Sequence, residues 1–381
     1  MLRLTLSGAL AAGVLAAAGL VSPAAASPAA PPAVAARTAL LGTPGDLRRV
    51  SLPFFWPNNY LYDVSAASPD SVWIAGTQGE LVVPGPIPGT GRTIPGNPVV
   101  RRWKDGGWVE YPLGGLPSHA TIIGVDAVAP EDVWISGTKH VTENSHQPYV
   151  ARFTGSAFTQ VALPPGTTAA HVQADASGVW LSTATDLYRW TDGTWAHLTA
   201  LPELRWQHTL RVRSADDIWL FGEVSDYSDT LEAAHWDGTS WTRSTLHQPG
   251  RFGTITDVLP LPSGEAWAVG VNWSDGGGRP ILLHWDGTAW ESVPVPAGLN
   301  SLGSIVRAPD GTLWANGHAG DQPAAPGLIR YRGGAWERVP TPAVPNRSNV
   351  HVDALTVDPV SGALWTLGTV NIGGPVLLSD R

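Results

Sequence analysis

The side chains best suited to chemistry recur at one position of the chain, just before a stretch of alternating apolar residues. Three carboxylates and one imidazole stand there: Asp63, His171, Asp257 and Asp353. Gathered around one opening, such groups could hold a hard or borderline divalent ion, or serve as an acid and a base. The full set, in chain order and with one insertion before the last member, is Asp63, Gly124, His171, Thr209, Asp257, Ser304 and Asp353.

A structural role competes with this chemistry. Asp, Ser and Thr at the start of a strand also accept hydrogen bonds from nearby backbone N–H groups. We favour that interpretation, and keep Asp63, His171, Asp257 and Asp353 as the candidate catalytic residues. No metal site is assigned and no cofactor is predicted, although a divalent cation is compatible with these residue types.

Other chemical motifs are scarce. His140 and His146 share one predicted loop, but their spacing is a poor metal signature without a third ligand. The chain contains no Cys, which excludes disulfides, thiolate metal sites and a cysteine nucleophile. It also lacks a P-loop, a G-x-S-x-G elbow and an H-E-x-x-H pair.

A repeat supplies the elements that must position the candidate residues. A Trp that follows a turn recurs seven times, with a mean spacing of about 49 residues. Turn residues such as Asp-Gly separate the short apolar stretches between them, so each unit is predicted to hold four strands, A to D. The repeated Trp lies in strand B, and its seven copies are Trp73, Trp134, Trp180, Trp219, Trp267, Trp314 and Trp365.

Aromatic residues that end strand C and open strand D indicate how these strands pair. They stand five residues apart, as in Trp236 and Trp241, so a tight loop places them opposite each other on one sheet face. Sixteen of the 19 Trp hold repeat positions, and we predict that these rings pack between neighbouring sheets rather than bind a ligand.

The last unit stops after its strand C, and residues 46–53 match the missing strand D. An N-terminal strand that completes the last unit would close a ring and remove an exposed sheet edge. The sequence therefore predicts one all-β domain over 46–381, a seven-bladed β-propeller of four-stranded antiparallel blades.

The repeats also resemble a known family. Their pattern, D-x-W-x-x-G followed by L-x-H-W-D-G-T-x-W-x-x-V-P-x-P, is similar to that of secreted bacterial β-propellers of the kelch and regulator-propeller kind. The resemblance implies the fold over nearly the whole chain after residue 45 and is silent on function, because propellers host unrelated activities.

Strand directions alternate within a blade, so the long connections are predicted to emerge on one face of the ring. We call the side of the B–C and D–A connections the loop face, and the side of the short A–B and C–D turns the turn face. Long loops on a rigid scaffold usually carry binding sites. The candidate ligand-binding residues on the loop face are Trp56, Tyr60, Arg205, Trp206, His208, Trp273 and His351.

The first residues of the chain predict export. Residues 1–26 hold Arg3, an apolar run and small residues suited to cleavage, which is typical of a secretory signal peptide. Residues 27–45, rich in Ala and Pro, are predicted to be a disordered leader. We expect a secreted, extracellular monomer with no membrane span after cleavage. The net charge of −9 argues against a nucleic-acid partner.

Export, acidity and the loop-face aromatic residues favour a secreted, non-catalytic binding or interaction propeller, whose partner is an extracellular glycan or a protein. The alternative is a lyase or hydrolase with a His and Asp site, metal-assisted, at the mouth of the channel. Two observations separate these hypotheses: whether the loop-face rings are exposed, and whether a His and a carboxylate converge in a pocket.

Overall fold

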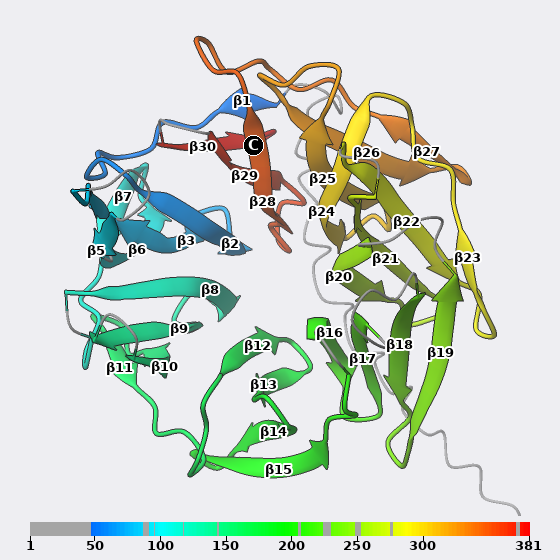
Figure 1. The fold of residues 1–381 in the computed structure, drawn as a ribbon, viewed down its shortest axis with the longest axis horizontal. Coiled ribbons are helices and arrows are strands. Elements are labelled where there is room, and N and C mark those ends of the chain that lie inside the picture. Colours follow the sequence, from blue (N-terminus) through cyan, green and yellow to red (C-terminus); the bar gives the residue numbers. More distant parts are fainter. Residues whose placement is uncertain are drawn as a thin grey trace, which may run out of the picture. The chain divides into compact units, whose positions relative to one another are not determined.

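Seven four-stranded antiparallel sheets follow one another around a central channel in the computed structural model of the chain (Figure 1). The predicted all-β, seven-bladed propeller is thereby confirmed. The predicted signal peptide, 1–26, and leader, 27–45, lie outside the described residues. The structure describes residues 47–86, 91–94, 96–116, 118–142, 145–204, 207–223, 230–247, 253–274, 277–370 and 374–381.

Each blade runs from strand A beside the channel to strand D at the periphery. Blade 1 comprises β2 (Tyr60–Ser68), β3 (Ser71–Gln78), β6 (Asn97–Lys104) and β7 (Gly107–Glu110), and β4 (Leu81–Val83) pairs with β5 (Arg92–Ile94) beside it. Blade 2 comprises β8 (Ala120–Ala129), β9 (Asp132–Thr142), β10 (Ser145–Phe153) and β11 (Phe158–Gln160). Blade 3 comprises β12 (His171–Asp175), β13 (Gly178–Ser182), β14 (Asp186–Thr191) and β15 (Thr194–Ala200).

The next three blades repeat this order. Blade 4 comprises β16 (Gln207–Ser214), β17 (Asp217–Glu223), β18 (Thr230–Trp236) and β19 (Trp241–His247). Blade 5 comprises β20 (Gly253–Pro260), β21 (Ala266–Asn272), β22 (Arg279–Trp285) and β23 (Trp290–Ser292). Blade 6 comprises β24 (Leu299–Arg307), β25 (Leu313–Ala319), β26 (Pro326–Arg332) and β27 (Ala335–Arg338).

Blade 7 is completed from the other end of the sequence. Its strands A to C are β28 (Val350–Val357), β29 (Leu364–Val370) and β30 (Gly374–Ser379), and its strand D is β1 (Arg48–Arg49). Arg48 and Arg49 pair with Ser379 and Leu378, and the Val50 amide donates to Leu377 O at 2.9 Å. The predicted closure of the ring by the N-terminal strand is consistent with this pairing.

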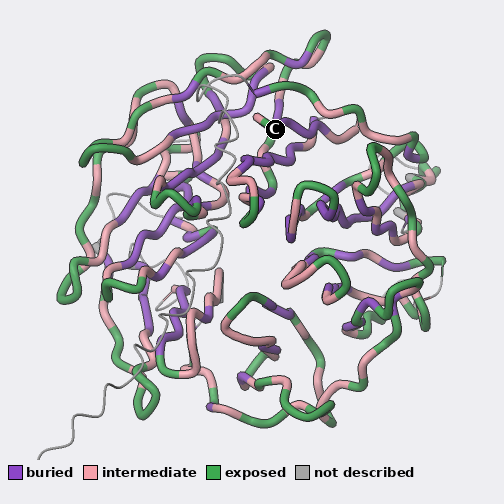
Figure 2. The backbone as a smooth tube through the Cα atoms, turned by 180° about the vertical axis from the view of Figure 1, so that it is seen from behind, coloured by how far each residue is buried: buried purple, intermediate pink, exposed green. Residues whose placement is uncertain are grey.

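The Trp of strand B fills the wedge between its own blade and the next. All seven are at least 93% buried, in agreement with the buried strands in Figure 2. Trp134 of blade 2 meets Trp190 and Trp195 of blade 3, with ring centroids 5.2 and 5.8 Å apart. Such cross-strand pairs stand in register as predicted: Trp103/Trp108, Phe153/Phe158, Trp190/Trp195, Trp236/Trp241, Trp285/Trp290 and Tyr331/Trp336.

A basic side chain lies over the ring of each buried Trp. In six blades it is the Arg or His that pairs in register with the Trp: Arg102, Arg152, Arg189, His235, His284 and Arg330. In blade 7 the register partner of Trp365 is Ser379, and the Arg381 guanidinium lies 5.0 Å from the Trp365 ring instead. A cation over an indole face is attracted by the ring quadrupole.

The connections differ from expectation in one respect. The segment 138–148, predicted as a loop, extends β9 and β10 into a longer hairpin, because Thr138 to Thr142 continue the ladder opposite Ser145 to Pro148. The C–D turns are short, as predicted. In blades 1 and 3 they are two-residue turns, and Asp105-Gly106 and Asp192-Gly193 take the positive φ values that such turns require. Within the described residues, no helix is long and apolar enough to cross a membrane.

Candidate functional site

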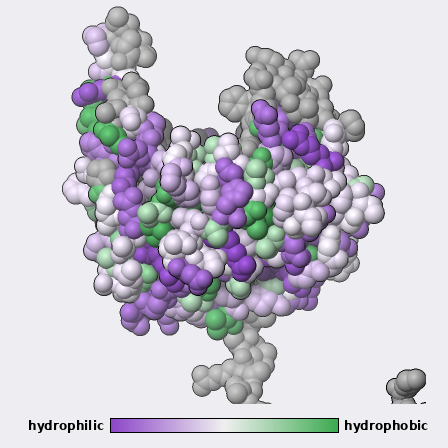
Figure 3. Space-filling view, turned by 90° about the horizontal axis from the view of Figure 1, so that it is seen from below, coloured by the Kyte–Doolittle hydropathy of each residue, from purple (hydrophilic) through white to green (hydrophobic). Residues whose placement is uncertain are grey.

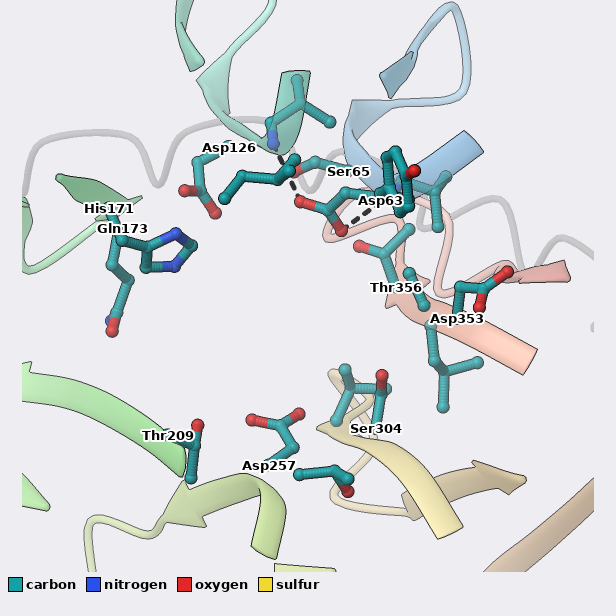
Figure 4. A pocket seen from close by; sticks show the side chains of 18 of the residues that line it. Asp63, Ser65, Asp126, His171, Gln173, Thr209, Asp257, Ser304, Asp353 and Thr356 are labelled. Atoms are coloured by element: carbon teal, nitrogen blue, oxygen red, sulfur yellow. Dashed lines mark hydrogen bonds between the residues drawn. The ribbon is translucent and has the colours of Figure 1, made fainter. Parts of the chain in front are cut away.

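A cavity of about 400 Å³ occupies the channel where the strands A converge (Figure 4). Side chains from all seven blades contribute to its wall. Asp63, Asp126, His171 and Asp257, from four different blades, surround one opening. The predicted gathering of carboxylates and one imidazole around the channel is therefore present in the fold.

The candidate position is set by a β-bulge, which sequence analysis did not foresee. We expected these residues just before strand A, but in blade 1 the register shifts between Leu61 and Asp63, inside β2. The glycine three residues after the strand-B Trp permits the bulge, because a Cβ on Gly76 would lie 2.0 Å from Tyr60 O. Six of the seven predicted residues pair with the residue two positions after their Trp: Asp63, Gly124, His171, Thr209, Asp257 and Ser304.

Asp353 was assigned wrongly to this set. In blade 7 the residue that pairs two positions after Trp365 is Ala354, while Asp353 is the extra residue of the bulge. Its carboxylate accepts a hydrogen bond from the Thr369 hydroxyl, and it still lines the cavity. The error lies in the count across the A–B turn, which has six residues between Val357 and Leu364 but five between Arg307 and Leu313 in blade 6. Counted back from Trp365, this one extra residue leads to Ala354.

Asp63 and Asp257 bridge neighbouring blades in the same way. Asp63 accepts the amides of Val64 and of Val125 in the next blade, both at 2.8 Å. Asp257 accepts the amide of Val258 at 2.9 Å and that of Ile305 in the next blade at 3.0 Å. Both carboxylates therefore fasten one strand A to the next, the structural role that the sequence analysis favoured.

Other side chains of strands A and B also form hydrogen bonds between neighbouring blades in the channel wall. Gln173 of blade 3 both donates to Val212 O and accepts the Val212 amide of blade 4. Asn316 of blade 6 donates to Ala354 O of blade 7 at 3.0 Å. Buried amides and carbonyls that would otherwise lack partners are satisfied by these contacts between blades.

The wall holds one guanidinium among several carboxyl groups. Arg211 donates to Asp257 at 2.6 Å and also contacts Val258 O at 3.3 Å. Burial raises the pKa of Asp63 to about 7, against the opposing effect of its backbone hydrogen bonds and of Arg211. Burial and then the negative charge of Asp63 raise the pKa of Asp126 well above its usual range.

His171 faces the channel water but is enclosed by the surrounding blades. This enclosure, and then the positive charge of Arg211, lower the pKa of its imidazole to about 4. Its Nδ1 lies 3.4 Å from Ser136 Oγ, and within the described part of the channel it meets no carboxylate at hydrogen-bond distance. No group of three or more His, Asp or Glu side chains in the described residues is arranged around a point where a metal could sit.

A second feature lies on the loop face, at the entry to blade 1. Phe54, Trp56, Tyr60 and Tyr62 expose 74, 61, 39 and 38% of their surface, and we call them the blade 1 aromatic surface. Phe54 and Trp56 meet edge to face at 6.1 Å, and Tyr60 stacks on Tyr62 at 6.4 Å. Trp56 thus meets Phe54, and Tyr60 meets Tyr62, two rings that were not among the predicted site residues.

The backbone of this segment is firmly held. The Trp56 amide donates to Gln78 Oε1 at 3.1 Å, and Asn59 Nδ2 donates to Trp56 O at 2.8 Å. The Arg101 guanidinium donates to Phe54 O at 2.8 Å and lies over the ring of Phe55, which is buried. The exposed rings are therefore presented by an ordered backbone, which lowers the entropic cost of binding a ligand.

The remaining loop-face candidates are dispersed. Trp273 is 54% exposed in the connection of blade 5, across the channel from blade 1 in Figure 1. His351 is exposed and stacks on His318 with ring centroids 5.5 Å apart. Arg205 and Trp206 lie outside the described residues, and only the backbone of His208 is described, in β16. Sequence reasoning missed Tyr62 and Arg211, whose strand positions gave no sign of a role.

Comparison with known proteins identifies the fold. No protein-family model matches the chain, and no curated protein matches it significantly in sequence. YCF48 bound to D1 peptide is 16% identical with a TM-score of 0.54, over 88% of this chain and 96% of that one. A virginiamycin B lyase from Staphylococcus aureus, bound to quinupristin, is 14% identical with a TM-score of 0.54, over 87 and 98%. A GH74 xyloglucanase from Xanthomonas campestris is 15% identical with a TM-score of 0.55, over 87 and 53%.

At such low identity these likenesses define the propeller architecture alone. The three names describe a protein bound to D1 peptide, a virginiamycin B lyase and a xyloglucanase, so the shared fold does not select a function.

Proposed function

We propose that the protein is a secreted, non-catalytic binding propeller that takes an extracellular glycan on its loop face. The observation that carries this proposal is the blade 1 aromatic surface, four exposed rings within nine residues on an ordered backbone. Exposed aromatic side chains that the fold does not need are enriched at binding surfaces. Flat rings stack on the C–H faces of sugars.

Acceptors for sugar hydroxyls stand beside these rings. Burial, and then the nearby charge of Glu80, raise the pKa of the Tyr62 hydroxyl, and Tyr60 and Asp353 act in the same direction. Two carboxylates therefore lie close to the stacked tyrosines. Asn58, which is exposed and donates to Glu80 O, adds an amide group to the same region. Rings flanked by carboxylates and amides suit a neutral, hydroxyl-rich ligand better than an acidic one.

The alternative, a lyase or hydrolase at the channel mouth, receives less support. Asp63 and Asp257 are engaged by backbone amides of two blades, and Asp257 is also paired with Arg211. His171 has no carboxylate partner in the described channel wall and a pKa too low for a base at neutral pH. An acid and a base poised on one reacting atom would need a closer arrangement.

The proposal is tested by applying the chain to an array of neutral and acidic cell-wall and capsular polysaccharides, then titrating any hit. We expect Trp56→Ala and Tyr60→Ala each to weaken binding at least about tenfold, which corresponds to about 1.4 kcal/mol. Val360→Ala, at a residue 72% exposed on the turn face, is the matched control and should bind as the unchanged chain does.

The array can also contradict the proposal. Glycan binding that persists in Trp56→Ala and Tyr60→Ala would place the site elsewhere. If no glycan on the array binds, and a protein partner is captured in a way that depends on Trp56 and Tyr60, the ligand is a protein and not a glycan.

A further inference from the structure

Three histidines stand side by side across three strands of blade 2. His140 in β9 and His146 in β10 are Cα partners in the antiparallel ladder. Ala120 pairs with Lys139, and the His140 amide donates to His119 O at 3.0 Å, so His119 continues the ladder on the other side of His140. Directly paired residues project their side chains to the same sheet face, about 4.5–5.5 Å apart at Cβ.

The row projects from the blade 2 surface that faces blade 3, at its loop-face end. Ser136 lies four residues before His140 on β9, so both project to the same side, and Ser136 Oγ lies 3.4 Å from His171 Nδ1 of blade 3. Lys139 projects to the other side, where its ammonium lies 5.3 Å from the Tyr149 ring. This part of β9 therefore places no lysine or arginine on the sheet face that carries the histidines.

The imidazole rings of this row lie close together. The rings of His140 and His146 meet edge to face with centroids 4.8 Å apart. His140 is half-buried, whereas His119 and His146 are exposed. Imidazole binds metals in its neutral form.

We propose that His119, His140 and His146 form a binding site for a borderline divalent transition ion such as Zn²⁺ or Cu²⁺. Imidazole nitrogens suit these ions, and three histidines with a water molecule complete a four-coordinate site. This site is independent of the glycan surface and of the channel carboxylates.

Binding requires rotation of side chains and no change of the backbone. The rings stand edge to face rather than around one point, so the exposed His119 and His146 turn about their χ angles to bring nitrogens to about 2.0–2.1 Å from the ion. Thr121 Oγ1 lies 3.2 Å from His140 Nε2. When Nε2–H donates to this hydroxyl, the lone pair of His140 is on Nδ1, and the hydroxyl orients the ligand from behind.

The sequence offered only two of these ligands. His140 and His146 looked like residues of one loop, and their spacing lacked a third partner. The extended hairpin places them in register, and the adjacent strand brings His119 to the row from 21 residues earlier in the chain.

The test is calorimetric titration of the full chain, without a histidine tag, with ZnCl₂. We expect one ion per chain, and a loss of affinity greater than about tenfold in each of His119→Ala, His140→Ala and His146→Ala, since even removal of a residue behind a ligand costs 10–100-fold. His351→Ala is the matched control, because His351 and His318 form a stacked pair that is not part of this row. It should bind Zn²⁺ as tightly as the unchanged chain.

A spectroscopic readout separates ligation from an effect on folding. Cu²⁺ bound to the chain should show hyperfine coupling to three nitrogens in its electron paramagnetic resonance spectrum. His119→Ala and His146→Ala, both at exposed residues, should each lose one coupled nitrogen without a change in melting temperature. Undiminished affinity in His119→Ala would overturn the three-histidine site. Binding that weakens equally in His351→Ala, or no saturable Zn²⁺ binding at all, would overturn it too.

Discussion

The wedges between blades and the blade 1 aromatic surface use the same residue type for different ends. Trp134 lies in a wedge, fully buried under Trp190 and Trp195, at a position that recurs in every blade. Trp56 occurs outside the repeat and is 61% exposed. In a repeat protein the recurrence of an aromatic residue therefore marks its structural role, and an aromatic residue that breaks the repeat marks a surface with another task.

The strand-A position that lines the channel is intermediate between the repeated Trp and the unrepeated Trp56. This position recurs in each blade, but its residue type varies from Asp to His, Thr, Ser and Gly. Where it is Asp, the carboxylate fastens two blades, and where it is His171, no such contact to the next strand A is made. A repeated backbone position can thus be structural in one blade and open to another use in the next.

The largest loss of stability should come from replacing a Trp in a wedge between blades. Trp134→Ala removes a fully buried indole and leaves a cavity that the rigid sheets cannot fill, so the free energy of unfolding should fall by about 3–5 kcal/mol. Chemical denaturation would measure it, with Trp56→Ala as the control, expected within about 0.5 kcal/mol of the unchanged chain. Equal losses in both variants would break the contrast between repeated and non-repeated aromatic residues.

The next effect concerns the fastening carboxylates. Asp257→Ala leaves the amides of Val258 and Ile305 and the Arg211 guanidinium without their acceptor. Because Arg211 retains access to channel water, we expect a loss of about 2–3 kcal/mol in the free energy of unfolding. Glu291→Ala, at an exposed strand-D site, is the control and should be nearly neutral. A neutral Asp257→Ala would refute the fastening role.

Asp63 should make the free energy of unfolding depend on pH. Its pKa is about 7 in the folded chain and near 3.8 when unfolded, so the folded state binds more protons between these values. The contribution of Asp63 is therefore greatest below about pH 4 and is lost as the pH rises through 7. Relative to Asp63→Asn, the unchanged chain should lose roughly 1–2 kcal/mol between these limits, since channel water screens part of the effect.

Denaturation of both chains at several pH values checks this expectation. Parallel curves would show that Asp63 titrates alike in the folded and unfolded chain.

The smallest effect should come from Arg381. Its guanidinium lies over Trp103 at 4.1 Å and Trp365 at 5.0 Å, in the wedge that joins blade 7 to blade 1. Arg381→Ala should lower the free energy of unfolding by about 0.5–1 kcal/mol. Arg189→Ala, which removes the equivalent contact with Trp180, should cost a similar amount. A much larger loss in Arg381→Ala would show that ring closure depends on this residue in particular.

The repeat made the fold predictable because its buried Trp, its turns and its cross-strand pairs all agree on one architecture. The Arg or His before the strand-C aromatic was visible too, as in the pairs Arg189-Trp190 and His235-Trp236, but its role needed the register with strand B. The position of Asp353 was missed by one residue because the A–B turn of blade 7 is one residue longer than that of blade 6. The extension of β9 and β10 could not be seen, because strand ends leave little trace in hydrophobic alternation.

The site was less predictable for a related reason. Asp63 and Asp257 were found from their position, yet their engagement with Val125 and Ile305 depends on the spacing of neighbouring blades. Trp56 and Trp273 stand outside the repeat, but only the structure shows that their rings are exposed. The pairing of Phe54 with Trp56 and of Tyr60 with Tyr62 required the path of the chain into blade 1.

The pairing of β1 with β30 has a consequence for how the chain folds. Arg49 meets Leu378 across more than 300 intervening residues, whereas the other strand pairs of the blades are formed by neighbours in the sequence. Local hairpins form early, and contacts between such distant segments form slowly. We expect the ring to close last, with β30 exposed as an unpaired edge until then. Folding intermediates should be open arcs of blades, and this edge is where two such arcs from different molecules would first join.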